Sequence, residues 1–165
     1  MGPTPVDIGA IAREHYDAVF RFCARRVGYE SAADAAQDTF LTAHRVARKY
    51  RGDSSVSTWL FGIAHNECRR IARSRRLDAP RIDFVDEHAQ ESQESRLIDR
   101  TALSDALLRL SSEHRDVVLL HELEGLTYEE AASVLDIPVG TVKSRLHHAF
   151  LQLRKALQPT GGEVK

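Results

Sequence analysis

The stretch from Leu126 to Leu157 constrains the fold of this chain more than any other part of it. Thr127 and Glu130 have the spacing of a capping box, which predicts that a helix begins immediately after Thr127. Asp136 tolerates the left-handed backbone of a tight turn, so this helix is expected to end there. Pro138 suits the first position of a new helix, because its missing N–H needs no partner there. The sequence therefore predicts two short helices joined by a turn of three or four residues.

The second of these helices has one apolar side and one polar side. Its inward stripe consists of Val142, Leu146, Ala149, Leu153 and Leu157. Its outward side carries Thr141, Lys143, Ser144, Arg145, His147 and His148. No acidic residue lies between positions 137 and 162, and a helix of this kind suits phosphates and base edges. We interpret the pair as a helix-turn-helix whose second helix reads the DNA major groove. The alternative is an ordinary helical hairpin with a solvated basic face.

Composition limits the class of protein. The chain has 165 residues, of which 42% are hydrophobic, enough for one or two domains with real cores. Cys23 and Cys68 are far apart and form no CxxC pattern, which argues against a disulfide framework and favours a reducing compartment. The N-terminus lacks a signal-peptide pattern, and no apolar run is long enough to span a membrane. These features predict a soluble, cytoplasmic protein without membrane insertion.

The spacing of apolar residues in the first half of the chain predicts three helices. The first covers Ile8 to Val27, the second covers Ala32 to Tyr50, and the third starts near Thr58 with Ser57 as its cap. The expected buried face of the second helix consists of Ala33, Ala36, Phe40, Ala43 and Ala47.

A basic tract follows in the third helix. Positions 69–76 hold five arginines and no acid, and Trp59 and Phe61 come before them along the same helix. Aromatic faces beside cations are what a single nucleic-acid strand requires, for stacking and for its backbone. A charge run is also common on an ordinary solvated face, and Trp59 alone is compatible with a core position.

Charge and composition divide the chain. Residues 1–77 are net basic, residues 78–98 contain six acids against two arginines, and the rest is again helical in pattern. We predict an all-α protein with two small helical domains, 1–77 and 99–160, joined by a flexible acidic linker at 78–98. The second domain is expected to be a four-helix unit that ends in the helix-turn-helix.

Four strings resemble one known family. EGLTYEEAA from Glu124 and IPVGTVKSRL from Ile137 resemble the C-terminal promoter-reading domain of bacterial sigma factors. DAAQDTF from Asp34 and STWLFGIAHN from Ser57 resemble that family's polymerase-binding and minus-ten segments. Two domains with a linker are the plan of its extracytoplasmic-function group. The family commonly has glycine where this chain has Asp136, and often an acid where it has Arg70.

The resemblance implies roles for individual residues. The major-groove helix would read the minus-thirty-five element through the six outward residues given above. The minus-ten element would be contacted by Arg51, Asp53, Ser54, Ser55, Trp59, His65, Asn66, Arg69, Arg70 and Arg73. Core polymerase would be bound through Asp34, Gln37, Asp38 and Phe40. The implied partners are the beta-prime clamp helices and beta flap of core RNA polymerase, promoter DNA and an anti-sigma factor.

Other classes fit less well. A helix-turn-helix regulator with a receiver domain would need alternating strands and helices in the first half. An enzyme is not expected, because Glu129 and Glu130 are adjacent and point differently on a helix. A zinc site would have to combine His65, Cys68 and Cys23, and neither a metal nor a cofactor is predicted. A protein that only sequesters a partner would not need the DNA-facing residues.

Overall fold

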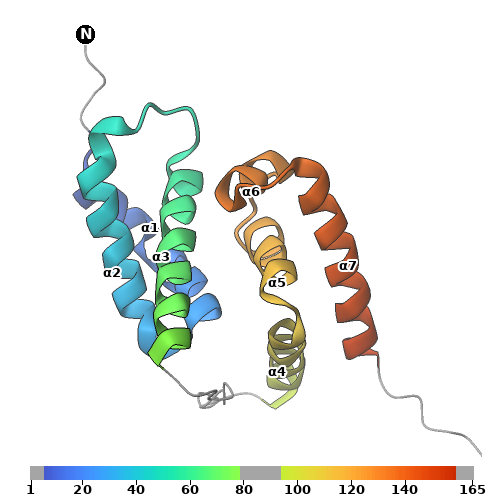
Figure 1. The fold of residues 1–165 in the computed structure, drawn as a ribbon. Coiled ribbons are helices and arrows are strands. Elements are labelled where there is room, and N and C mark those ends of the chain that lie inside the picture. Colours follow the sequence, from blue (N-terminus) through green and yellow to red (C-terminus); the bar gives the residue numbers. More distant parts are fainter. Residues whose placement is uncertain (1–5, 79–93, 159–165) are drawn as a thin grey trace, which may run out of the picture. The chain divides into compact units, whose positions relative to one another are not determined.

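The computed structural model describes residues 6–78 and 94–158, and within these two ranges the regular secondary structure is helical, without a β-strand. The described residues form two compact units (Figure 1). The all-α prediction is therefore confirmed. Each unit is described here by itself.

The first unit is a bundle of three long helices. Helix α1 covers Ile8–Val27, α2 covers Tyr29–Val46, a 3₁₀ turn covers Ala47–Lys49, and α3 covers Val56–Asp78. The three α-helices pack against one another in all three pairs. The largest fully buried side chains of this core are Val19, Phe22, Cys23, Thr39, Leu60 and Cys68.

Helix α1 has the predicted bounds, and its ends explain why. The side chain of Asp7 accepts a hydrogen bond from the backbone N–H of Ala10 at 3.1 Å, which caps the first turn. Gly28 closes the last turn with φ +85°, a left-handed conformation that a residue with a Cβ rarely adopts.

The prediction for α2 was wrong in its start and in part of its buried face: Ala36 and Ala43 are buried as predicted, whereas Ala33, Phe40 and Ala47 are not. The helix begins at Tyr29 because Gly28 alone makes the turn out of α1. Its buried residues are Ala32, Ala35, Ala36, Thr39 and Ala43. Thr39 can be buried because its hydroxyl donates to the Ala35 carbonyl at 2.7 Å. Ala33 and the edge of Phe40 consequently face outward, into a groove.

The third helix also starts earlier than predicted. It begins at Val56, and the residue that caps it is Ser55 rather than Ser57. The Ser55 hydroxyl oxygen accepts from the N–H of Thr58 at 3.1 Å, and its carbonyl accepts from the N–H of Trp59 at 3.0 Å.

The second unit contains α4 (Glu94–Arg109), α5 (Ser112–Val118), a π-helical turn (Leu119–Leu123) and α7 (Val139–Leu157). Both α4 and α5 pack on α7. Ser111 caps α5 by accepting from the N–H of His114 at 3.3 Å.

Arg115 of α5 closes the end of α4. Its guanidinium donates to the carbonyls of Leu107, Leu108 and Leu110 at 3.0, 2.8 and 3.1 Å. The last carbonyls of a helix have no partner within it, so a cation at this place stabilises the helix end. Burial lowers the pKa of Arg115 from its usual value.

The helix-turn-helix segment follows the prediction closely. Helix α6 covers Tyr128–Leu135, and Asp136 then has φ +54°, the one positive value of a non-glycine residue in the described parts. Pro138 is the N-cap of α7 rather than its first residue, and its carbonyl accepts from the N–H of Thr141 at 2.9 Å. Of the predicted inward stripe of α7, Leu157 is exposed and the other four residues are buried.

Most of the predicted linker, residues 79–93, lies outside the described residues. Its last positions belong to α4, which begins at Glu94.

Candidate functional site

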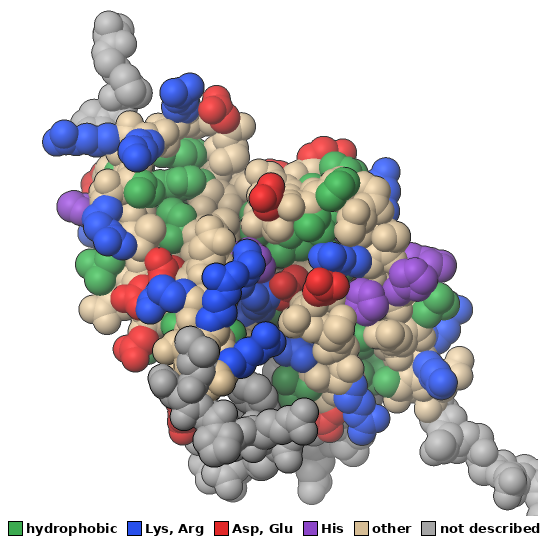
Figure 2. Space-filling view, viewed as in Figure 1, with side chains coloured by type: hydrophobic (Ala, Val, Ile, Leu, Met, Phe, Trp, Pro, Cys, Tyr) green, Lys and Arg blue, Asp and Glu red, His purple; other side chains and the backbone are tan. Residues whose placement is uncertain are grey.

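Helix α7 displays the predicted reading residues. Lys143, Ser144, His147 and His148 are exposed, while Thr141 and Arg145 are half-buried. Figure 2 shows histidine side chains gathered over this helix, with Lys and Arg nearby. The structure thus brings all six predicted residues to the outward side of one helix.

Two of these cations are held by neighbours that sequence reasoning did not assign to the site. The Lys143 ammonium lies 5.4 Å from the ring centroid of Tyr128, and that ring stacks on His121 at 4.4 Å. Arg145 Nη2 lies 3.5 Å from a carboxylate oxygen of Glu113 in α5. No local pattern could have identified Glu113, because it is brought to α7 only by packing.

A second basic surface lies on α3. A shallow groove on this helix is lined by Asn66, Arg69, Arg70, Arg73 and Ser74. The first four of these are exposed, and they are among the residues predicted to contact the minus-ten element. Figure 2 shows Lys and Arg side chains gathered along this helix. Such a groove can attract a phosphate backbone. Arg75 has another role, since it donates to the Val27 carbonyl at 2.6 Å and to the Ser31 hydroxyl.

The loop before α3 is tied to the start of that helix. The Tyr50 hydroxyl donates to the Ser54 carbonyl at 2.5 Å, and the Tyr50 ring stacks on Trp59 with centroids 4.6 Å apart. Trp59 is half-buried, so it is not a core residue, and part of its side chain is accessible. Arg51 and Asp53 are exposed in the same loop.

His65 differs from the other predicted minus-ten residues because it is only 6% exposed. Burial, followed by the charges of Arg26 and Arg69, lowers the pKa of His65 from 6.5 to about 4. A neutral, enclosed ring offers little surface to DNA, and we therefore interpret His65 as part of the core of the first unit.

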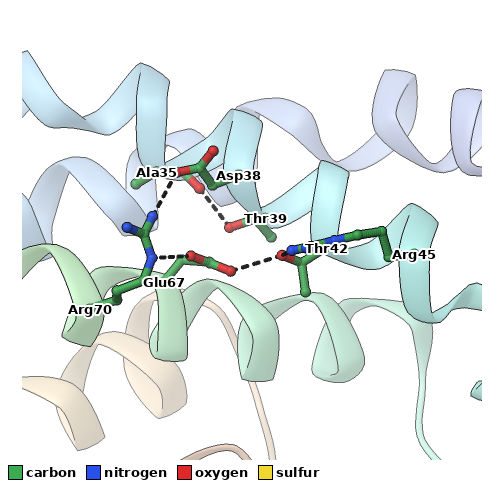
Figure 3. A network of polar contacts seen from close by, with 7 residues as sticks. All are labelled: Ala35, Asp38, Thr39, Thr42, Arg45, Glu67 and Arg70. Carbon is green, nitrogen blue, oxygen red and sulfur yellow. Dashed lines mark hydrogen bonds and ion pairs between the residues drawn. The ribbon is translucent and has the colours of Figure 1, made fainter.

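The predicted polymerase-facing residues lie along α2. Asp34 and Gln37 are exposed, and Asp38 and Phe40 are half-buried. Gln37 and Phe40 belong to an open, largely apolar groove between α1 and α2, which is lined by Ile8, Gly9, Ala12, Tyr16, Ala33, Gln37, Phe40, Leu41 and His44. Asp38 is ion-paired with Arg70 of α3 (Figure 3).

The cysteines are buried next to each other rather than displayed. Cys23 of α1 and Cys68 of α3 are free thiols, and they are hydrogen-bonded to each other. This hydrogen bond, together with burial, raises the pKa of Cys23. Within ranges 6–78 and 94–158, no three His, Cys, Asp or Glu side chains are grouped as a metal site, and no helix is long and apolar enough to cross a membrane.

Comparison with known proteins identifies two family models and several relatives that match this chain. Residues 11–77 match the family model of sigma-70 region 2, and residues 100–153 match that of sigma-70 region 4. The chain is 33% identical over 161 residues to the RNA polymerase sigma factor YlaC of Bacillus subtilis, with 93% of each chain covered. It is 34% identical over 140 residues to the ECF RNA polymerase sigma-E factor of Escherichia coli, covering 76% of this chain and 73% of the relative.

A solved structure agrees with the fold. The sigma factor RpoE of Bartonella quintana, crystallised with the anti-sigma factor NepR, superposes with a TM-score of 0.79 and 27% identity. The match covers 93% of this chain and 98% of that one. Because both matched family models are regions of sigma-70 factors, the chain belongs to the sigma-70 class. Within it, the chain belongs to the extracytoplasmic-function group of RNA polymerase sigma factors.

Proposed function

We propose that this chain is an alternative sigma factor that directs core RNA polymerase to specific promoters and starts transcription. The observation that carries the proposal is the presence in one chain of an acid-free, exposed α7 and a separate basic groove on α3. A regulator that only binds duplex DNA needs the first surface and not the second. The receiver-type alternative also needs strands, and residues 6–78 contain none.

The second domain, 99–160, would read the upstream element. Helix α7 would enter the major groove and place Lys143, Ser144, Arg145 and His147 against base edges, with Thr141 and His148 toward phosphates. The pair between Arg145 and Glu113, at 3.5 Å, supports a defined direction for the guanidinium. We expect the affinity for promoter DNA to fall strongly as salt concentration rises, because cationic side chains that bind phosphates release the counterions of the DNA.

The first domain, 1–77, would hold the melted strand of the minus-ten element. Asn66, Arg69, Arg70 and Arg73 offer donors along one groove. Trp59 and the loop residues Arg51, Asp53, Ser54 and Ser55 lie at the start of the same helix. A base captured there must leave its stack, which costs a few kcal/mol, and contacts of this kind are what offset that cost.

Helix α2 would bind the clamp helices of the polymerase. Asp34, Gln37 and Asp38 supply polar groups beside the apolar groove that contains Phe40, a combination suited to an amphipathic helix. The second domain would contact the beta flap. Asp38→Arg is expected to weaken binding to core, and unchanged affinity would contradict this role.

An anti-sigma factor would keep the protein inactive by covering the same groove and helix faces. The proposal is supported by the relative from Bartonella quintana, which was crystallised with such a partner. The chain would then act in the cytoplasm, where the polymerase and its promoters are, and as a binding subunit rather than an enzyme.

Run-off transcription tests the proposal. Core polymerase is incubated with and without the full chain on DNA from the vicinity of its own coding region. A transcript that appears only with the chain supports the function. Absence of any transcript together with tight, sequence-specific binding of the isolated chain to duplex DNA would favour a plain regulator.

A further inference from the structure

Arg70 of α3 connects carboxylates from two helices. Its Nη2 lies 2.7 Å from Asp38 Oδ2 in α2, and its Nε lies 2.9 Å from Glu67 Oε2 in α3 (Figure 3). Asp38 and Arg70 are 32 residues apart in sequence, so only the packing of α2 against α3 brings them together.

The Glu67 side of this network is fixed. The second oxygen of Glu67 accepts a hydrogen bond from the Thr42 hydroxyl at 2.8 Å, and Thr42 accepts one from Arg45 at 2.9 Å. The Glu67 side chain is only 14% exposed. An arginine anchored on such a carboxylate has few alternative orientations, because its planar fork is held at Nε.

The Asp38 side is open to a partner. Its side chain is 40% exposed, and Arg70 engages only Oδ2, so Oδ1 remains available for another donor. In the described structure the pair therefore orients a carboxylate that can still be bound from outside.

We propose that Arg70 is a positioning residue for polymerase binding, which holds the Asp38 carboxylate in the orientation that the polymerase recognises. This inference rests on the proposed function of α2. A side chain that is already ordered loses less conformational freedom on binding, so the pair increases affinity for core without contacting it.

The same geometry separates Arg70 from the other arginines of the α3 groove. Two carboxylates partly neutralise its charge, whereas Arg69 and Arg73 have no ion pair among the described residues. The predicted DNA contact of Arg70 is compatible with the positioning role, since Nη1 is left to donate to a phosphate. Arg69 and Arg73 would nevertheless supply most of the charge attraction.

The pair is too exposed to matter much for folding. Arg70 is 59% and Asp38 40% exposed, and ion pairs of this kind contribute little to stability. A positioning role therefore predicts a change in core affinity without a matching change in thermal stability, which a purely structural role would not give.

A double-mutant cycle on the full chain tests the inference. Affinity for purified core polymerase is measured by fluorescence anisotropy for the unmodified chain, Asp38→Asn, Arg70→Gln and the double variant. We expect Asp38→Asn to lower affinity by about tenfold and Arg70→Gln by about fivefold. We expect the double variant to match Asp38→Asn alone, because Arg70 acts only through Asp38.

Controls keep the outcomes distinct. Arg70→Lys retains charge but loses the fork, and it is expected to fall between Arg70→Gln and the unmodified chain. Arg21→Gln, an exposed charge loss on α1, is expected to leave core affinity unchanged. The inference about Arg70 would be overturned if the affinity losses of the two single variants multiplied in the double variant, or if every loss of affinity were matched by a fall in thermal midpoint. Neither result would affect the proposed function. Failure of the unmodified chain to bind core would overturn the proposed function as well.

Discussion

The indole of Trp59 stacks on the ring of Tyr50, with centroids 4.6 Å apart and planes inclined by 29°. The stack joins the last residue before the loop to the first turns of α3, and the Tyr50 hydroxyl also binds the Ser54 carbonyl. The stack and this hydrogen bond together hold the loop that is proposed to capture a base and the aromatic ring at the start of the helix that carries the basic groove.

Trp59→Ala is expected to reduce promoter opening by roughly 5- to 150-fold, because base–aromatic stacking is worth about 1–3 kcal/mol per base. The measurement is the fluorescence of 2-aminopurine placed in the minus-ten element, with saturating core. Tyr50→Phe keeps the stack and loses only the hydroxyl, so it is expected to retain most of the opening. Equal defects in both variants would mean that the hydroxyl, not the stack, is what matters.

Arg145→Ala is expected to lower promoter-specific initiation by roughly 5- to 150-fold, which corresponds to about 1–3 kcal/mol for one lost base contact. Affinity for core is expected to stay the same, since α7 is assigned to DNA. Arg154→Ala, an exposed charge loss in the last turn of α7, is the matched control. A loss of core binding equal to the loss of initiation would contradict the assignment.

Asp136→Gly is expected to stabilise the protein by about 0.5–1 kcal/mol, because the left-handed backbone costs a residue with a Cβ about 1–2 kcal/mol. Asp136 has this left-handed backbone, with φ +54°. Asp136→Val is expected to destabilise by about 1–2 kcal/mol, since a β-branched residue tolerates this conformation poorly. Thermal unfolding followed by circular dichroism measures both, and the opposite order would show that the Asp136 side chain makes a compensating contact.

Arg115→Met is expected to destabilise the second unit by about 2–3 kcal/mol, because three carbonyls at the end of α4 lose their donor while the apolar stem is kept. Urea unfolding of the full chain measures it. Arg109→Met, at an exposed position of the same helix end, controls for the loss of charge. A similar effect of both variants would show that charge, rather than the carbonyl contacts, is responsible.

His65 is expected to make stability pH-dependent. Its pKa is about 4 in the fold and 6.5 unfolded, so unfolding takes up a proton between these values. The contribution is fully present above about pH 6.5 and is lost as pH falls toward 4, by about 3 kcal/mol at most. We expect His65→Leu to lose less stability than the unmodified chain between pH 7 and 5, measured as thermal midpoints. Parallel curves would mean that His65 does not titrate differently in the two states.

Local interactions explain why several elements could be predicted from the residues alone. Asp7 and Gly28 lie at the two ends of α1, and they act on the turn next to them in sequence. The left-handed Asp136 and the inward stripe of α7 are likewise set by neighbours within a few residues. The six outward residues of α7 follow from that stripe, because a helix with one buried side must expose the other.

Packing decided what local patterns left open. Alanines occupy both sides of the early turns of α2, so their periodicity gave little contrast, and contact with α1 and α3 selected Ala32 and Ala35 for the core in place of the predicted Ala33. Burial of His65 depends in the same way on its neighbours in the folded bundle.

The sequence by itself determined the helical class, the acid-free reading helix and the left-handed turn before it, because each arises from residues close together in the chain. Only the tertiary structure decided that Asp38 meets Arg70, that Glu113 meets Arg145 and that Cys23 meets Cys68. These pairs join different helices, and a preference for a partner tens of residues away leaves no periodic signal in a single sequence.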